Sequence, residues 1–382
     1  MKYTLILTLC LVFCQINAQN KDVGIRDLFS SVVHLSDLIP EKKVIKNKEY
    51  EILIKNQKNG KTQARKTFKA GTGFFIYKNL DIYLVTAAHV AKDLSINAKL
   101  KYQSSKGIKR EVTMDKLLEP NTKQIPWVLH PKADVAVLHI PLKIFDTDFY
   151  KKLNLGAIGY SGIIEKLEVP DRLQEITVFG FPLGLGISYK SIAPITKNLR
   201  PASDIIYLRR FDNKVVNPFF LLDDPSISGF SGGPVMRVIS IDRTMAFRPG
   251  ISMQPTITGL VHGTINGKAG GFAAIVPGIQ ILETINLAPS YNGKYIFYYP
   301  NGSIWSEVIY KNGIPWNVIS NFGPDGKPQD KGTLKNGNGE LYIYNEDGKQ
   351  EWTFIFKNGR YLGNVAIMTK SEKAKFNKLI AK

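Results

Sequence analysis

Three short segments carry residue types that hydrolysis of an amide bond requires. Such a reaction at neutral pH needs a nucleophile, a base that takes its proton, and N–H donors for the oxyanion that forms. Ser231 lies in a glycine-rich turn, Gly229-Phe230-Ser231-Gly232-Gly233-Pro234. His89 follows two alanines, and Asp134 precedes an apolar run. Together they are candidates for one hydrolytic site.

In order and in surrounding sequence, these segments resemble those of trypsin/chymotrypsin-like serine peptidases. The matching strings are Leu84-Val85-Thr86-Ala87-Ala88-His89-Val90, His130-Pro131-Lys132-Ala133-Asp134-Val135-Ala136-Val137-Leu138 and Gly229-Phe230-Ser231-Gly232-Gly233-Pro234-Val235. The resemblance implies that Ser231 is the nucleophile and that His89 is first the general base and then the general acid. It implies that Asp134 accepts a hydrogen bond from His89 Nδ1–H and fixes the tautomer of that ring. The implied oxyanion hole consists of the N–H groups of Gly229 and Ser231.

Two further segments extend the resemblance to bacterial, HtrA-type catalytic domains, although no PDZ-type domain is recognisable after Leu287. Gly180-Phe181-Pro182-Leu183-Gly184 resembles a turn that precedes the nucleophile strand, and Gly259-Leu260-Val261-His262-Gly263 resembles the strand that pairs with substrate. The implied substrate-binding residues are His262, Gly263 and Ala273. For His262 the alternatives are a pocket that binds an acidic side chain, a structural role, or a place close to the triad.

The chain departs from the vertebrate trypsins at two positions. Phe230 stands before the nucleophile, where those enzymes have an aspartate that pairs with a newly cut N-terminus. Pro225 stands where they have the aspartate that binds basic side chains. We therefore expect no such activation switch: either the chain folds directly into an active form, or the oxyanion loop is ordered in another way.

Net charge and motif content indicate which classes of partner the chain is expected to bind. The 382 residues carry a formal net charge of +19, but the lysines are spread along the chain without a long block. This spread favours scattered surface lysines over a nucleic-acid-binding patch. No zinc or calcium spacing, phosphate-cradling loop or nucleic-acid motif is present, so we expect a protein or peptide substrate, no cofactor, no metal and no nucleic acid.

Residues 1–18 have the pattern of a secretory signal peptide. The apolar run Tyr3 to Cys14 follows a lysine, and Ala18 offers a cleavage point. The run is too short for a permanent transmembrane anchor. We expect export to the periplasm or secretion. Both cysteines, Cys10 and Cys14, lie inside this segment, so the mature chain is expected to lack disulfides and thiol chemistry.

Short β-type runs separated by Gly, Pro, Asn and Asp fill the chain from Gly71 to about Leu287. Without long helices between them, they predict an all-β barrel or sandwich, with Phe29–Leu35 as an early strand and Ile279–Ile285 as a short closing helix. The resemblance implies a double antiparallel β-barrel over a peptidase domain at 19–288. His89 and Asp134 would lie on the first barrel and Ser231 on the second.

Residues 291–363 have a different, aromatic-rich pattern. Turn glycines recur at steps of 11, 13, 11, 11 and 11 residues, at Gly302, Gly313, Gly326, Gly337, Gly348 and Gly359. The Asn-Gly and Asp-Gly pairs predict β-hairpin turns, and the repeat resembles MORN-like repeats. We expect the units to form one meandering sheet, followed by a basic tail at 364–382. The aromatic residues either form a face for peptide, glycan or envelope contact or pair across strands and fill the sheet.

These patterns predict an exported serine endopeptidase that acts through an acyl-enzyme without a cofactor. Two alternatives stay open. The chain could be a catalytically silent binding module on a protease fold, or a surface-attachment protein that uses its aromatic C-terminal repeats.

Overall fold

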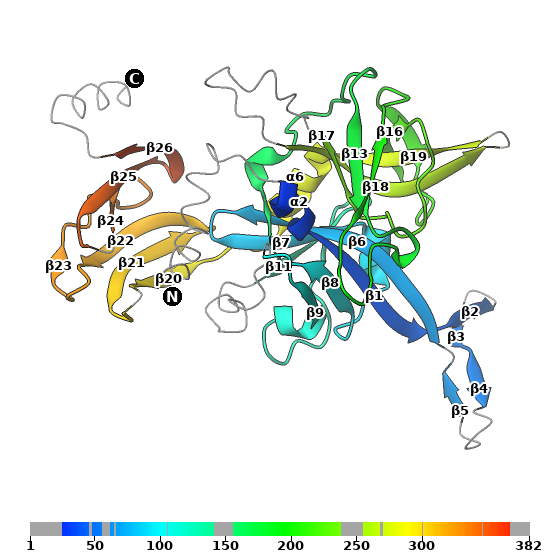
Figure 1. Cartoon of the computed structure of the whole chain (residues 1–382), viewed down its shortest axis with the longest axis horizontal. Helices are drawn as coiled ribbons and strands as arrows, with labels where there is room; N and C mark the ends of the chain where they lie inside the picture. The colour runs from blue at the N-terminus through cyan, green and yellow to red at the C-terminus, as the bar shows by residue number, and fades with distance from the viewer. Residues whose placement is uncertain are drawn as a thin grey trace. The chain divides into compact units, whose positions relative to one another are not determined.

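The computed structural model of the protein describes residues 25–45, 48–55, 62–64, 66–104, 106–140, 156–237, 255–267, 270–299, 301–345 and 347–366. The chain divides into two compact units. The N-terminal unit takes in residues 21–78 and 82–288, and the C-terminal unit takes in residues 289–382 with residues 79–81. Figure 1 shows the elements of both. The predicted signal peptide at 1–18 lies outside the described residues, as does most of the predicted basic tail.

The N-terminal unit contains a first antiparallel sheet in the order β10-β11-β7-β6-β1-β8-β9, with β12 parallel to β6. Its strands are β1 (Val32–Pro40), β6 (Lys66–Lys78), β7 (Asp81–Thr86), β8 (Lys99–Gln103), β9 (Lys109–Thr113), β10 (Val128–Leu129), β11 (Ala136–Ile140) and β12 (Ile158–Gly159). Helix α3 (Ala88–Lys92) directly follows β7. Two small antiparallel pairs precede β6, namely β2 (Lys42–Ile45) with β3 (Lys48–Glu51) and β4 (Leu53–Lys55) with β5 (Thr62–Ala64).

A second antiparallel sheet of the same unit has the order β14-β13-β17-β18-β19-β16-β15. Its strands are β13 (Ile176–Gly180), β14 (Ile195–Leu199), β15 (Ile206–Arg209), β16 (Val216–Leu222), β17 (Pro234–Arg237), β18 (Thr256–Gly267) and β19 (Gly270–Pro277). Its core cluster of apolar side chains includes Ile176, Phe220, Phe230 and Ile275. Short 3-10 helices lie at η1 (Met114–Leu117), η2 (Tyr160–Gly162) and η3 (Pro182–Gly184).

The predicted all-β fold with antiparallel sheets is confirmed, and so is the closing helix, which is α6 (Gly278–Leu287) after Pro277. The predicted strand at Phe29–Leu35 is partly wrong. Helix α2 (Ile25–Ser31) occupies its first part, and Ser31 Oγ donates a hydrogen bond to the carbonyl of Leu28 within the helix. Among the described residues, no helix has the length and apolar content to cross a membrane.

The C-terminal unit contains two antiparallel sheets rather than the one meandering sheet we expected. The first has the order β20-β21-β22-β23 and the second β24-β25-β26. Their strands are β20 (Gly293–Tyr298), β21 (Ile304–Lys311), β22 (Ile314–Phe322), β23 (Pro328–Gln329), β24 (Gly339–Tyr344), β25 (Gln350–Lys357) and β26 (Arg360–Ala366). The interruption falls at residues 330–338, a polar and glycine-rich stretch with few strand-forming side chains.

The recurring glycines do form the predicted turns. Every one of the six has a positive φ, between 71° and 86°. In three Asn-Gly pairs the asparagine is also left-handed, with φ of 52°, 51° and 52° at Asn312, Asn336 and Asn358. Positive φ at both central residues is the signature of the tight turn that matches the twist of paired strands. The eleven-residue step therefore marks strand–turn units.

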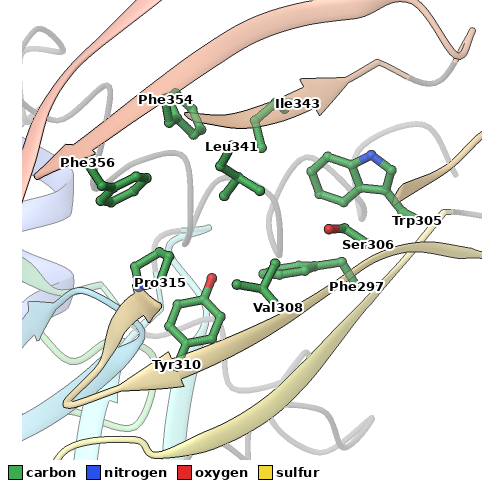
Figure 2. Close-up of a pocket in the computed structure, with 10 residues that line it drawn as sticks. All are labelled: Phe297, Trp305, Ser306, Val308, Tyr310, Pro315, Leu341, Ile343, Phe354 and Phe356. Atoms are coloured by element: carbon green, nitrogen blue, oxygen red, sulfur yellow. The ribbon is translucent and has the colours of Figure 1, made fainter. Parts of the chain in front are cut away.

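Most aromatic side chains of the C-terminal unit are buried. Figure 2 shows Leu341, Ile343, Phe354 and Phe356 opposite a group that includes Phe297, Trp305, Val308 and Tyr310. The gap between them is a cavity of about 30 Å³ with an apolar lining. A cavity for a small-molecule ligand is roughly ten times larger. The aromatic residues around it thus act as packing residues that join the two sheets.

The turn at Gly337 gives a test of this packing. Its φ is +73°, and an added Cβ would lie 2.6 Å from Trp316 and 2.7 Å from the Gly359 nitrogen. We expect Gly337→Ala to destabilise the C-terminal unit by about 2–3 kcal/mol, from backbone strain and overlap together. Gly302→Ala is the matched control, since its φ is +86° but nothing lies within 4 Å of the added Cβ. Thermal unfolding measures both variants. Equal losses of stability in Gly337→Ala and Gly302→Ala would show that the overlap with Trp316 and Gly359 contributes nothing.

Candidate active site

Asp134 is fully buried just before β11, in a turn that His130 organises. The His130 ring nitrogen Nδ1 accepts hydrogen bonds from the N–H groups of Ala133, at 2.7 Å, and Lys132, at 3.1 Å. The His130 N–H in turn donates to the carbonyl of Val135. His130 is therefore a turn residue, and it fixes the backbone from which the Asp134 carboxylate projects.

Strand pairing brings His89 to this carboxylate. The last residue of β7, Thr86, lies opposite Ala136 of β11, so the helix that follows β7 starts next to Asp134. The small side chains of Ala88 and Ala91 pack against Ala136 and allow this close approach. The His89 N–H donates to Asp134 Oδ1 at 3.0 Å, and His89 Nδ1 lies 2.7 Å from Asp134 Oδ2.

Two further side chains converge on the same carboxylate. His262 Nδ1 lies 2.5 Å from Oδ2, and Arg210 Nη2 lies 3.0 Å from Oδ1. Burial alone would raise the pKa of Asp134, but hydrogen bonds from His262 and His89 hold the pKa of that carboxyl well below its usual range. Because an ionised carboxylate only accepts hydrogen bonds, both histidines carry a proton on Nδ1. This is the tautomer in which His89 Nε2 can act as a base.

Ser231 lies in a tight turn between β16 and β17. Gly229 and Gly232 have φ of +103° and +83°, and a Cβ on Gly232 would lie 2.2 Å from the carbonyl oxygen of Thr72. Phe230, between Gly229 and Ser231, is buried in the core cluster of the second sheet. The sequence departure at this position is thus an apolar anchor for the turn at 229–233, which carries the predicted nucleophile and is called the nucleophile turn below.

The turn is held against β18 next to His262. The Gly232 N–H donates to the Val261 carbonyl at 2.9 Å, and the Val261 N–H donates to the Gly233 carbonyl at 3.0 Å. The pairing of β18 with β19 shifts between Val261 and Gly263, so His262 is the extra residue of a β-bulge. Such bulges re-aim side chains near functional sites. Here the bulge lies at the residue whose ring contacts Asp134.

His262 connects the predicted nucleophile with the predicted acid. Its ring bonds Asp134, and its carbonyl oxygen accepts a hydrogen bond from Ser231 Oγ at 3.2 Å. The ring centres of His89 and His262 are 5.8 Å apart. All three residues of the predicted triad therefore gather around His262. For attack, Ser231 must exchange the His262 carbonyl for His89 Nε2 as its acceptor.

Thr72 of β6 holds the segment predicted to form the oxyanion hole. Its hydroxyl donates to the Gly229 carbonyl at 2.6 Å and accepts from the Phe181 N–H at 3.0 Å, and its own N–H donates to the Ser231 carbonyl at 2.9 Å. Within the described part of the chain, the N–H groups of Gly229 and Ser231 donate no hydrogen bond. Both donors are thus available to an oxyanion.

Removing this hydroxyl should loosen the turn. We expect Thr72→Val to lower the free energy of unfolding by about 1–3 kcal/mol, because the buried N–H of Phe181 loses its acceptor. If the Gly229 N–H binds an oxyanion, hydrolysis at this site should also fall by about 10- to 100-fold, because Gly229 loses its anchor. Thr72→Ser keeps the hydroxyl and is the control. Equal turnover in the valine and serine variants would contradict this role for the hydroxyl.

The other two predicted substrate-binding residues are Gly263, which lies under the ring of Phe211, and Ala273, which lies in the core of the second sheet. Phe211, at the turn between β15 and β16, stacks on the His262 ring with centres 4.2 Å apart and meets the His89 ring edge-on at 5.0 Å. An added Cβ on Gly263 would come within 2.9 Å of Phe211, so this ring lies over Gly263. Ala273 lies in the same core cluster as Phe230.

The group His89, Asp134 and His262 also has the residue types of a metal site. Their ligand atoms lie within 4.8 Å of one another. Ligands of one tetrahedral zinc ion are about 3.3 Å apart, given metal–ligand distances near 2.0 Å. The two nitrogen–oxygen distances here, 2.5 and 2.7 Å, are shorter and are those of hydrogen bonds. This arrangement fits protons between the groups rather than a metal ion.

Sequence reasoning missed Arg210 and Thr72. Arg210 is almost completely buried, and besides Asp134 it bonds both carboxylate oxygens of Asp212 and the Lys132 carbonyl. Its string, Arg209-Arg210-Phe211-Asp212, has no feature that distinguishes it from an exposed hairpin turn. Thr72 lies between Gly71 and Gly73, and a hydroxyl between two glycines is a signal that could have indicated a backbone anchor.

Comparisons with known proteins leave the family open. No protein-family model matches the chain, and no curated protein matches it. Among solved structures, the chain is similar to the Rv3671c protease from M. tuberculosis in its active form, with 16% identity, 72% of this chain and 85% of that chain covered, and a TM-score of 0.36. The MamO protease domain from Magnetospirillum magneticum has 14% identity, with 56% of this chain and 86% of that chain covered and a TM-score of 0.33. An inactivated protease paralogue from the scabies mite has 14% identity, with 70% of this chain and 96% of that chain covered and a TM-score of 0.34. These TM-scores are below 0.5, so the functional argument rests on the residues of this chain.

Proposed function

We propose that the protein is an exported serine endopeptidase with the triad Ser231, His89 and Asp134. The observation that carries the proposal is the buried Asp134 carboxylate, which holds His89 by both the backbone N–H and Nδ1. This pair lies beside a tight glycine turn that presents Ser231. A histidine fixed in one tautomer, a serine and unused N–H donors are the parts that acyl transfer needs.

The proposed reaction uses only groups of the chain. Ser231 Oγ attacks the substrate carbonyl while His89 Nε2 takes its proton, and the N–H groups of Gly229 and Ser231 bind the oxyanion. His89 then donates the proton to the leaving amine, and the acyl group remains on Ser231. Water, activated by His89, hydrolyses this ester and restores the serine.

Labelling with a fluorophosphonate tests the proposal, because such probes react only with an activated serine. We expect one adduct per chain, on Ser231 by peptide mapping. Labelling should disappear in Ser231→Ala and fall greatly in His89→Ala. A folded chain that stays unlabelled at all pH values would reject the proposal.

One observation favours a second candidate, a catalytically silent binding module. Ser231 Oγ donates to the His262 carbonyl and not to His89. If this hydrogen bond persisted with substrate bound, the serine would not be activated. The unlabelled outcome of the same experiment supports this candidate, provided that the chain still binds peptide.

Surface attachment through the C-terminal repeats has less support. The aromatic side chains of the C-terminal unit mostly face its interior. Tyr298, which is half exposed, is an exception. Deletion of residues 291–382 should leave turnover of a small peptide intact if the site in the N-terminal unit carries the activity.

A further inference from the structure

One aromatic ring at the candidate site is packed against the histidines and yet is open to solvent. The ring of Phe211 stacks on the His262 ring with centres 4.2 Å apart, and it meets the His89 ring edge-on at 5.0 Å. The His262 ring also contacts that of Phe219, at 5.0 Å. The exposed fraction rises from 1% for Phe219 and 3% for His262 to 49% for Phe211. Phe211 is therefore the outermost ring of a series that starts in the core, and part of it is open beside the proposed base.

The hairpin that carries Phe211 is fixed on both sides of this residue. Its two neighbours in sequence, Arg210 and Asp212, form a bidentate ion pair, with guanidinium nitrogens 2.8 and 2.6 Å from the two carboxylate oxygens. Arg210 also donates to the Lys132 carbonyl at 2.8 Å and to Asp134 at 3.0 Å. A ring on such a backbone loses little conformational freedom when a ligand packs against it, and this favours binding.

The ring of Phe211 lies over a part of β18 that has an open edge. Strand β17 pairs with β18 only as far as Leu260, whereas β19 pairs with it up to Gly267. Among the described residues, no further strand pairs with β18 on its β17 side. Gly263 lies in this open part, and a Cβ added to it would come within 2.9 Å of the Phe211 ring. Side chains that face each other across paired strands have Cβ atoms about 5 Å apart. A peptide that paired with this edge would thus place a side chain against Phe211.

We propose that Phe211 is a specificity-determining residue whose ring contacts a flat apolar side chain of the bound peptide, that of an aromatic residue or a proline. The inference rests on the proposed function, because the peptide in question is the one whose bond Ser231 attacks. An open ring gains by stacking on another flat apolar group and by the removal of apolar surface from water. The charges of Arg210 and Asp212 beside the ring are paired with each other, so neither favours a charged side chain at this position.

Three variants isolate the contribution of the ring. Phe211→Ala removes it, and Phe211→Tyr keeps its face and adds one hydroxyl. Tyr207→Ala is the matched control, since Tyr207 is 66% exposed and lies on β15 of the same hairpin. In the described part of the chain, the Tyr207 ring is not one of those that contact His89 or His262. Thermal unfolding of each full-length variant shows first that it is folded.

The substrates are a series of short peptides in which one position at a time is phenylalanine, proline, leucine, glycine, aspartate or lysine. Mass spectrometry locates each cut, and kcat/KM is measured for each peptide. At one position, we expect the parent chain to prefer phenylalanine or proline over glycine by about 10-fold, and we expect Phe211→Ala to lose this preference. Phe211→Tyr and Tyr207→Ala should retain it. A preference that survives in Phe211→Ala, or a preference for aspartate or lysine that Phe211→Ala abolishes, would overturn the inference.

Labelling by the fluorophosphonate separates contact with the peptide from mere support of the His89 ring. The probe reports the reactivity of Ser231 and carries no peptide side chain. If Phe211 only held His89 in place, Phe211→Ala would slow labelling and the turnover of every peptide by the same factor. We expect instead that the loss for the phenylalanine and proline peptides exceeds the loss of labelling by about 10-fold. Equal losses would overturn the inference.

Binding separates this inference from the proposed function. Fluorescence anisotropy of the same peptides, labelled with fluorescein, measures affinity for the Ser231→Ala chain without cleavage. We expect Phe211→Ala in that background to weaken binding of the phenylalanine and proline peptides by about 10-fold and to leave the glycine peptides nearly unchanged. This result with a parent chain that shows no turnover would support the ring contact and reject the peptidase. Turnover that does not depend on Phe211 would reject the ring contact alone, and peptides that are neither bound nor cut would reject both.

Discussion

Replacement of Ser231 or His89 by alanine will lower kcat for a small peptide substrate by about 10⁴- to 10⁶-fold. In the proposed mechanism the nucleophile and the base act in the same step, so neither contributes without the other. The double variant should therefore be no slower than either single variant. Steady-state turnover with matched protein concentrations measures all three.

His139→Ala is the control for this series. His139 lies on β11 opposite Tyr83 and packs against that ring, away from the Asp134 carboxylate. We expect its kcat to stay within a few-fold of the parent chain. Losses that multiply in the Ser231 and His89 double variant would show that the two side chains act independently, in conflict with a triad.

The second large effect concerns stability. Phe230→Ala should lower the free energy of unfolding by about 3–5 kcal/mol, since the removed ring is buried in the core cluster of the second sheet. Turnover should also fall steeply, because Phe230 lies between Gly229 and Ser231 and fixes both N–H donors. Denaturant unfolding measures the loss of stability, and steady-state kinetics with a small peptide measures the loss of turnover.

Two controls bracket the Phe230 result. Phe230→Leu keeps most of the apolar volume and should cost less than half as much. Phe68→Ala removes a ring that is 60% exposed and should change stability by less than about 1 kcal/mol. A Phe230→Ala chain as stable as the Phe68→Ala chain would mean that the nucleophile turn is not anchored by the core.

The sequence was sufficient to predict the β-sheet fold, the closing helix and the glycine turns of the C-terminal unit. These features depend on local patterns, such as Asn-Gly pairs and Pro277 before a helix, that have few alternative structures. The candidate residues His89, Asp134 and Ser231 were also found locally, because each lies in a distinctive string. Their proximity to one another follows from the pairing of β7 with β11 and of the nucleophile turn with β18.

What the sequence could not predict depends on long-range placement. Arg210 lies 76 residues from Asp134, and only the folded second sheet brings the two together. The role of His262 was left open because the β-bulge that aims its ring at Asp134 is a property of strand register. The break of the repeat into two sheets lies at residues 330–338, where the eleven-residue spacing continues although the strands do not.

The central claim is that Ser231, His89 and Asp134 work as one unit, and a crystal structure with a peptide boronic acid tests it most directly. We predict a tetrahedral adduct on Ser231 Oγ, with one boronate oxygen at hydrogen-bond distance from the N–H groups of Gly229 and Ser231. His89 Nε2 should lie within hydrogen-bond distance of the adduct, and His89 Nδ1 should still bond Asp134. An unmodified Ser231 that keeps its hydrogen bond to the His262 carbonyl, with the inhibitor bound elsewhere or absent, would contradict the account.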